Sequence, residues 1–242
     1  MMKSSDEPVT CTRRPTHKVI YGFFWAMLGA AVVLALLILL LPGSVFLAIS
    51  NYLQILAALF AAVALITSRL RCGTPSACLY AAAGFALWGV ANIAWYVNVA
   101  AGLRALVFPS IIDLGMIASF LILAIALRNG FPKANVPSQL LSGLLAVCLI
   151  IPAVVMVIAG INAATLITLA YFFACGAFLM IGLKHSMAKN RNLLIGSILF
   201  ALTFMIYPLR EMFFADNPIL PVIGTFVTAG FALMVIGWLS AQ

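Results

Sequence analysis

Three long stretches of the chain carry no charged side chain, and this feature limits the possible folds more than any other. A soluble protein has about a quarter charged residues, whereas this chain has 7% charged and 66% hydrophobic residues and a mean hydropathy of +1.22. Such stretches are typical of segments that cross the hydrocarbon core of a bilayer. They lie between Lys18 and Arg69, between Arg71 and Arg104, and between Lys133 and Lys184.

The apolar runs predict membrane-spanning helices. Crossing about 30 Å of hydrocarbon takes about 20 apolar residues in a helix, which satisfies its own backbone hydrogen bonds. The runs lack the alternation of barrel strands, and the first is longer than the core of a signal peptide, so we expect it to be a membrane anchor. A count of seven would require the first two helices to be continuous through the turn at 42–44. Pro, Gly, Asn and charged residues divide the chain into helices at about 21–41, 45–68, 77–101, 109–127, 137–159, 163–183, 193–214 and 218–240.

The basic residues predict the orientation of these helices. If both termini and the even-numbered loops share one side, only Arg104 and Arg210 lie opposite, so the positive-inside rule places both termini in the cytoplasm and the protein in the cell membrane. The net charge of +8 then reflects topology and some attraction to membrane lipid, with no nucleic-acid partner expected. The residues on the cytoplasmic side are Lys3, Arg13, Arg14, Lys18, Arg69, Arg71, Arg128, Lys133, Lys184, Lys189 and Arg191.

An internal repeat is visible when the chain is shifted by 112 residues. The shift aligns Gly84, Trp88, Trp95 and Pro109 with Gly196, Phe200, Tyr207 and Pro221. We therefore expect an all-α integral membrane protein, an eight-helix bundle built from two parallel four-helix repeats, because units with an even number of helices enter the membrane in the same orientation. The expected organisation is a cytoplasmic polar tail at 1–20, a first repeat at 21–130 and a second repeat at 131–242.

Polar residues inside the expected spans are candidates for a ligand site, because such residues are costly in a membrane. At 1.5 Å per residue, nearly all lie within about 15 Å of the outer surface, while the inner half is almost purely apolar. We expect a polar pocket in the outer half. Its candidate ligand-binding residues are Asn51, Gln54, Trp88, Asn92, Trp95, Tyr96, Asp113, Tyr207, Arg210 and Glu211.

Four of these candidates lie on one stripe of the helix at 77–101. Trp88, Asn92, Trp95 and Tyr96 are spaced by four, three and one residues, which brings them to one face. The stripe could stack a flat ligand. It could equally be an aromatic belt, with Asn92 bonded to a neighbouring helix.

Asp113 has two interpretations. It follows Ser110 by three residues, and Ser-x-x-Asp is a capping box at the start of a helix. Alternatively, its carboxylate could pair with Arg104 or Arg210, or accept hydrogen bonds from Asn92 or Tyr96, and so orient a ligand.

Arg210 and Glu211 also allow two interpretations. Pro208 precedes them and is expected to break the helix near its outer end, which could free backbone carbonyls for binding. The same residues could be a last helical turn at the water interface, with Asp216 near Arg210 or Arg104.

Several chemistries do not fit the sequence. His17 and His185 lie in cytoplasmic segments, so they cannot hold a haem inside the membrane, and no lysine lies mid-span to bind retinal. Phosphate-binding loops, nucleophile elbows and zinc motifs are absent. We expect no cofactor and no metal.

Residues 85–131 resemble a stretch of the multispan membrane sensor regions that precede bacterial diguanylate cyclases and histidine kinases. The resemblance rests on "ALWGVANIAWY", then "FPSIID", then an apolar helix ending in "LRNGF", with Trp88, Trp95, Pro109, Ser110 and Asp113 as pattern residues. It implies a sensor architecture. Those proteins carry a cytoplasmic output domain that does not follow the last helix here, so signalling would need a separate cytoplasmic partner.

These observations favour a non-enzymatic sensor or binding protein for a lipid or small amphiphile in an outer-half pocket. A secondary transporter is the first alternative, because paired repeats suit alternating access. An intramembrane lipid-acting enzyme that uses Asp113, Glu211 or Asp216 as acid or base is the second. A purely structural subunit of a larger complex is a further possibility.

Overall fold

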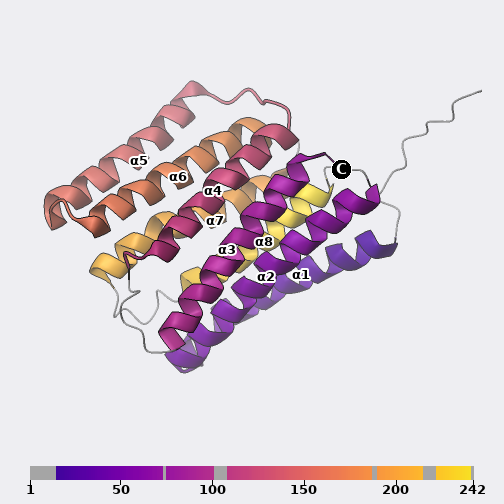
Figure 1. Cartoon of the computed structure of the whole chain (residues 1–242), viewed down its shortest axis with the longest axis horizontal. Helices are drawn as coiled ribbons and strands as arrows, with labels where there is room; N and C mark the ends of the chain where they lie inside the picture. The colour runs from indigo at the N-terminus through magenta and orange to yellow at the C-terminus, as the bar shows by residue number, and fades with distance from the viewer. Residues whose placement is uncertain (1–14, 73–74, 101–107, 187–189, 215–221, 241–242) are drawn as a thin grey trace, which may run out of the picture.

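The protein folds as a bundle of long helices (Figure 1). The computed structural model describes residues 15–72, 75–100, 108–186, 190–214 and 222–240. In these ranges eight helices are long and apolar enough to cross a membrane, and a short 3₁₀ helix, η2 (Leu37–Leu39), follows the first. The predicted all-helical, multi-pass fold is confirmed. The eight are α1 (Pro15–Leu36), α2 (Gly43–Cys72), α3 (Ala77–Ala100), α4 (Ile111–Gly130), α5 (Ser138–Ala159), α6 (Ala163–Ser186), α7 (Arg191–Phe213) and α8 (Ile223–Ser240).

Two helices continue past the charged residues at which they were predicted to end. Helix α2 continues through Arg69 to Cys72, and α4 continues through Arg128 to Gly130. Charged residues end a membrane span but they are good helix formers, so the helix continues into the interface. The turn before α2 is present, because η2 ends at Leu39 and Pro42 precedes the first residue of α2. The first two helices are therefore separate.

Six helices form a closed ring in which each packs against the next, in the order α2, α3, α4, α6, α7 and α8. Outside the ring, α1 packs against α8 and α2, while α5 lies at the opposite edge against α6 (Figure 1). Only 17% of the span of α5 is buried inside the protein, compared with 72% for α8. Helix α8 is thus a central helix, whereas α5 presents most of its apolar surface outward.

Aromatic side chains fill the middle of the ring. Phe120 of α4 stacks on Phe200 of α7 with ring centroids 4.4 Å apart, and Trp88 of α3 meets Phe231 of α8 edge-on at 4.7 Å. All four side chains are fully buried. Because lipid tails are as apolar as these rings, close packing rather than exclusion of water holds such helices together.

Glycines allow α7 and α8 to approach closely. A β-carbon added to Gly196 would lie 2.7 Å from the carbonyl oxygen of Gly230 and from the backbone nitrogen of Met234. Small residues at helix contacts are a common solution in membranes, because they bring two backbones together.

The two ends of the bundle differ in character. At the end where α2, α4 and α6 finish and α3, α5 and α7 begin, the described residues include Arg69, Arg128, Lys133, Lys184 and Arg191. We call this the basic end. The opposite end, where α3 and α7 finish, is the polar end, and it carries Arg210. The predicted cations Lys3, Arg13, Arg14, Arg104 and Lys189 lie outside the described residues.

Candidate functional site

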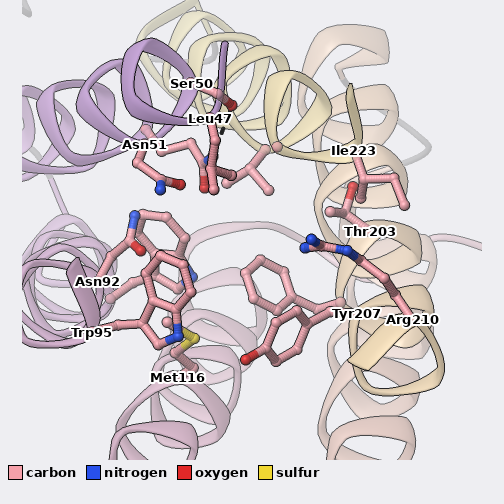
Figure 2. Close-up of a pocket in the computed structure, with 15 residues that line it drawn as sticks. Leu47, Ser50, Asn51, Asn92, Trp95, Met116, Thr203, Tyr207, Arg210 and Ile223 are labelled. Carbon is pink, nitrogen blue, oxygen red and sulfur yellow. Dashed lines mark hydrogen bonds between the residues drawn. The ribbon is translucent and has the colours of Figure 1, made fainter. Parts of the chain in front are cut away.

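A cavity of about 80 Å³ lies at the polar end of the bundle (Figure 2). At about 10–15 Å³ for each water position, it has room for roughly six waters or a small headgroup. Five helices contribute to its wall, because α3 and α7 end there while α2, α4 and α8 begin. The lining residues are Leu47, Ser50, Asn51, Gln54, Trp88, Asn92, Trp95, Met116, Thr203, Phe204, Tyr207, Arg210, Ile223, Gly224 and Val227.

Seven of the ten predicted site residues line this one cavity. These side chains are distant in the sequence but were predicted to lie at a similar depth from the helix ends. The ring of helices places them around one cavity. That they bind a ligand stays a prediction. The seven are Asn51, Gln54, Trp88, Asn92, Trp95, Tyr207 and Arg210.

Helix α2 supplies a polar wall that packs closely against the start of α8. The Gln54 amide donates a hydrogen bond from Nε2 to the Ser50 hydroxyl at 3.2 Å. A β-carbon on Gly224 would lie 2.5 Å from both of these side chains, so only glycine leaves them room. Ser50 and Gly224 were not among the predicted residues, since small residues in an apolar run give no signal until the facing helix is known.

The predicted stripe on α3 divides between two environments. Trp88, Asn92 and Trp95 line the cavity, and Figure 2 shows Asn92 facing Asn51 of α2. Tyr96 does not line it, because its hydroxyl donates to that of Tyr52 on the α2 surface at 3.1 Å. One residue step turns a helix by about 100°, which is enough to move Tyr96 out of the cavity.

Helix α7 supplies the cation. It continues through Pro208 to Phe213, so the expected break at Pro208 is wrong: proline removes one backbone donor, and packing against α6 and α8 holds the remaining turns. The Arg210 guanidinium points into the cavity (Figure 2). Its Nη1 forms an ion pair with Oε1 of Glu211 at 3.2 Å, and Glu211 itself does not line the cavity.

In the part of the chain that the structure describes, three buried N–H groups of the lining residues have no hydrogen-bond partner. They are Nε1 of Trp88, Nδ2 of Asn92 and Nε of Arg210. Trp88 is 0% exposed and Asn92 is 4% exposed, so bulk water does not satisfy them. Unpaired donors in an apolar interior are costly, and they mark places where a water or ligand acceptor belongs.

Asp113 lies outside the cavity and caps its own helix. The backbone N–H and the hydroxyl of Ser110 donate to Oδ2 of Asp113 at 2.7 and 3.0 Å, and the two residues form a capping box. The Tyr171 hydroxyl donates to Oδ1 at 2.8 Å. Asp113 is 2% exposed and Tyr171 is 0% exposed.

Tyr207 lies next to both this buried pair and the cavity. Its ring lies 5.8 Å from that of Tyr171, while it also lines the cavity wall. Tyr171 was missed in the sequence, because a tyrosine in the middle of an apolar run has no motif to connect it with Asp113. Arg104, a predicted partner of Asp113, lies outside the described residues, as does Asp216, a predicted partner of Arg210 or Arg104.

Within the described part of the chain, no group of three or more His, Cys, Asp or Glu side chains is placed to hold a metal ion. His185 lies near the basic end of α6, with Nδ1 2.7 Å from the Phe131 carbonyl oxygen. The side chain of His17 lies outside the described residues.

Comparison with known proteins finds no matching family model, no matching curated protein and no matching solved structure. The class of the protein therefore follows from its fold and cavity alone. It is a helical protein of the multi-pass membrane type, with a cavity of mixed polar and apolar lining at one end of a ring of six helices.

Proposed function

We propose that the protein is a non-enzymatic membrane sensor or binding protein that recognises a lipid or small amphiphile in the polar-end cavity. The supporting observation is the mixed lining of the cavity: the amides of Asn51 and Asn92 and the Arg210 guanidinium face apolar side chains such as Leu47 and Ile223. Ligand sites are typically apolar hollows with a few convergent polar groups. Polar groups at such depth in a membrane span are functional candidates by default.

The enzymatic alternative has less support from the geometry. The Asp113 carboxylate accepts three hydrogen bonds and does not line the cavity. Glu211 is engaged by Arg210. A general acid or base must come within hydrogen-bond reach of its substrate, and of the three predicted acids, the two that the structure describes do not line the cavity.

The proposal includes two parallel four-helix repeats. The ring order supports them, because α2, α3 and α4 are followed by α6, α7 and α8 in the same sequence of contacts. The glycine contacts agree: Gly84 lies against Leu123 of α4, and Gly196 lies against Met234 of α8, which corresponds to Leu123 within one residue. The outer helices break the symmetry, since α1 packs on the opposite repeat and α5 on its own.

We further propose that the basic end faces the cytoplasm and that the protein resides in the cell membrane with both termini inside. The same proposal includes a separate cytoplasmic signalling partner and a cavity that opens towards the outer side. In a bacterial host, a green fluorescent protein fused after Gln242 is expected to fluoresce, and alkaline phosphatase inserted at Asn162 is expected to be active. The reverse pattern would contradict this orientation.

The binding proposal predicts a specific defect in a Trp95→Ala variant. Native mass spectrometry of the purified protein identifies any retained lipid, and a panel of lysophospholipids and fatty acids is then tested for thermal stabilisation. The variant is expected to lose about tenfold or more in affinity, because a large aromatic wall residue is removed from the cavity. Its unliganded melting temperature should change little, since Trp95 is only partly buried.

Trp25→Ala is the matched control, because Trp25 is 46% exposed on α1 and does not line the cavity. Equal loss of ligand response in both variants would argue against a site in the cavity. Counterflow of the bound molecule in proteoliposomes would instead support a transporter.

A further inference from the structure

Three buried polar atoms of the cavity wall are hydrogen-bond donors without a partner. Trp88 and Arg210 each present an N–H and Asn92 presents an amide NH₂, and none of the three has a hydrogen-bond acceptor within reach among the described residues. They come from two helices, α3 and α7, on different sides of the same hollow. A molecule that satisfies them must bring acceptor atoms.

The charge of the wall points to the sign of that molecule. Among the fifteen cavity-lining residues that the structure describes, Arg210 is the one charged side chain. Glu211 engages its Nη1 from outside the lining and leaves Nε unpartnered. An anionic acceptor gains more than a neutral one from such donors, because hydrogen bonds to charged groups are roughly twice as strong, and the effect grows where water is scarce.

The remaining wall is suited to an alkyl chain. Leu47, Met116, Phe204, Ile223 and Val227 are apolar lining residues next to the polar groups. The cavity volume of about 80 Å³ is sufficient for a headgroup but too small for a whole lipid. A ligand would therefore place its headgroup inside and leave its chain along the helices.

We infer that the cavity binds the anionic headgroup of an amphiphile, a carboxylate or a phosphate monoester, with the Trp88, Asn92 and Arg210 N–H groups as donors. This inference rests on the proposed binding function and specifies its ligand class. The carboxylate and the phosphate share the chemistry that matters here, which is at least two anionic acceptor oxygens.

Chain-matched probes test the headgroup. The full chain is placed in phosphatidylcholine nanodiscs and titrated with dodecanoate, dodecyl phosphate and the uncharged dodecanol, with thermal stability and tryptophan fluorescence as readouts. One or both anions are expected to bind at least tenfold more tightly than dodecanol. Inorganic phosphate and acetate distinguish a free anion from a lipid headgroup, and they are expected to bind at least a hundredfold more weakly than the amphiphile.

Variants test the donors. Asn92→Leu is expected to weaken anion binding about tenfold and Arg210→Met about a hundredfold, because each loses a hydrogen bond to a charged acceptor. Arg128→Met at the basic end is the matched control and should bind like the wild type. If Arg210→Met fails to fold, Arg210→Lys takes its place. It keeps the positive charge but lacks the Nε donor, so it should bind the anions several-fold more weakly than the wild type.

Two tryptophan variants test whether the cavity is the binding site, independently of which headgroup it prefers. Leu47→Trp fills the cavity wall, whereas Val45→Trp places the same ring at a residue of α2 that is exposed and does not line the cavity. If dodecanol binds as tightly as the anions and only Leu47→Trp blocks it, the cavity binds amphiphiles but the anionic headgroup is wrong. If no probe binds, or if neither variant affects binding, the donors hold water only and both proposals are overturned.

Discussion

Replacing Asp113 with alanine is expected to lower the free energy of unfolding by about 2 to 4 kcal/mol. The carboxylate completes the capping box of α4, and loss of such a cap costs about 0.5–2 kcal/mol. The fully buried Tyr171 hydroxyl would also lose its acceptor, which costs a further 1–3 kcal/mol. Thermal unfolding of the detergent-purified protein should show a drop in melting temperature of roughly 10 °C.

Two milder variants show which of these contacts matters. Tyr171→Phe removes one donor to Asp113 and leaves the capping box, so it should lose about 1 kcal/mol. Asp113→Asn keeps one amide oxygen, which can accept either from Ser110 or from Tyr171. Its loss of stability should therefore lie between the losses of Tyr171→Phe and Asp113→Ala. An Asp113→Ala protein that is as stable as the wild type but no longer responds to ligand would show that the carboxylate contacts the ligand instead.

The helices were predictable because a bilayer sets their length. Charge-free runs bounded by residues such as Arg69, Arg71 and Lys133 located the spans, and the proline at 42 marked the first turn. The ring was not predictable from periodicity. Helices that are apolar on every side, such as α8, have no polar face to indicate which side is buried, so the order of packing emerged only in three dimensions.

The depth of the site was predictable, but its angular position was not. Asn51, Asn92 and Arg210 each lie a few turns or less from a helix end at the same side of the bundle, so counting residues brought them to one level. Whether a side chain turns inward depends on the rotation of its helix. Trp95 lines the cavity and its neighbour Tyr96 does not, and the sequence has no signal that separates them.

Gly196→Ala is expected to destabilise the bundle by about 2 to 3 kcal/mol, although alanine is the better helix former. Its new methyl group would lie 2.7 Å from backbone atoms of Gly230 and Met234, and backbone cannot rotate away as a side chain can. Helices α7 and α8 must therefore separate, and overpacking of this kind typically costs 1–3 kcal/mol. The melting temperature of the purified protein measures the effect.

Two other glycines serve as matched controls for this substitution. In Gly84→Ala, the position that a shift of 112 residues aligns with Gly196, the methyl group meets side-chain carbons of Leu123 at 2.7 and 2.9 Å, and these can shift, so the expected loss is about 1 kcal/mol. Gly29→Ala has nothing within 4 Å and should match or slightly exceed the wild type. The order Gly29→Ala, Gly84→Ala, Gly196→Ala in falling stability follows from what each methyl group meets. Equal stability of all three would mean that the backbones of α7 and α8 do not approach closely at Gly196.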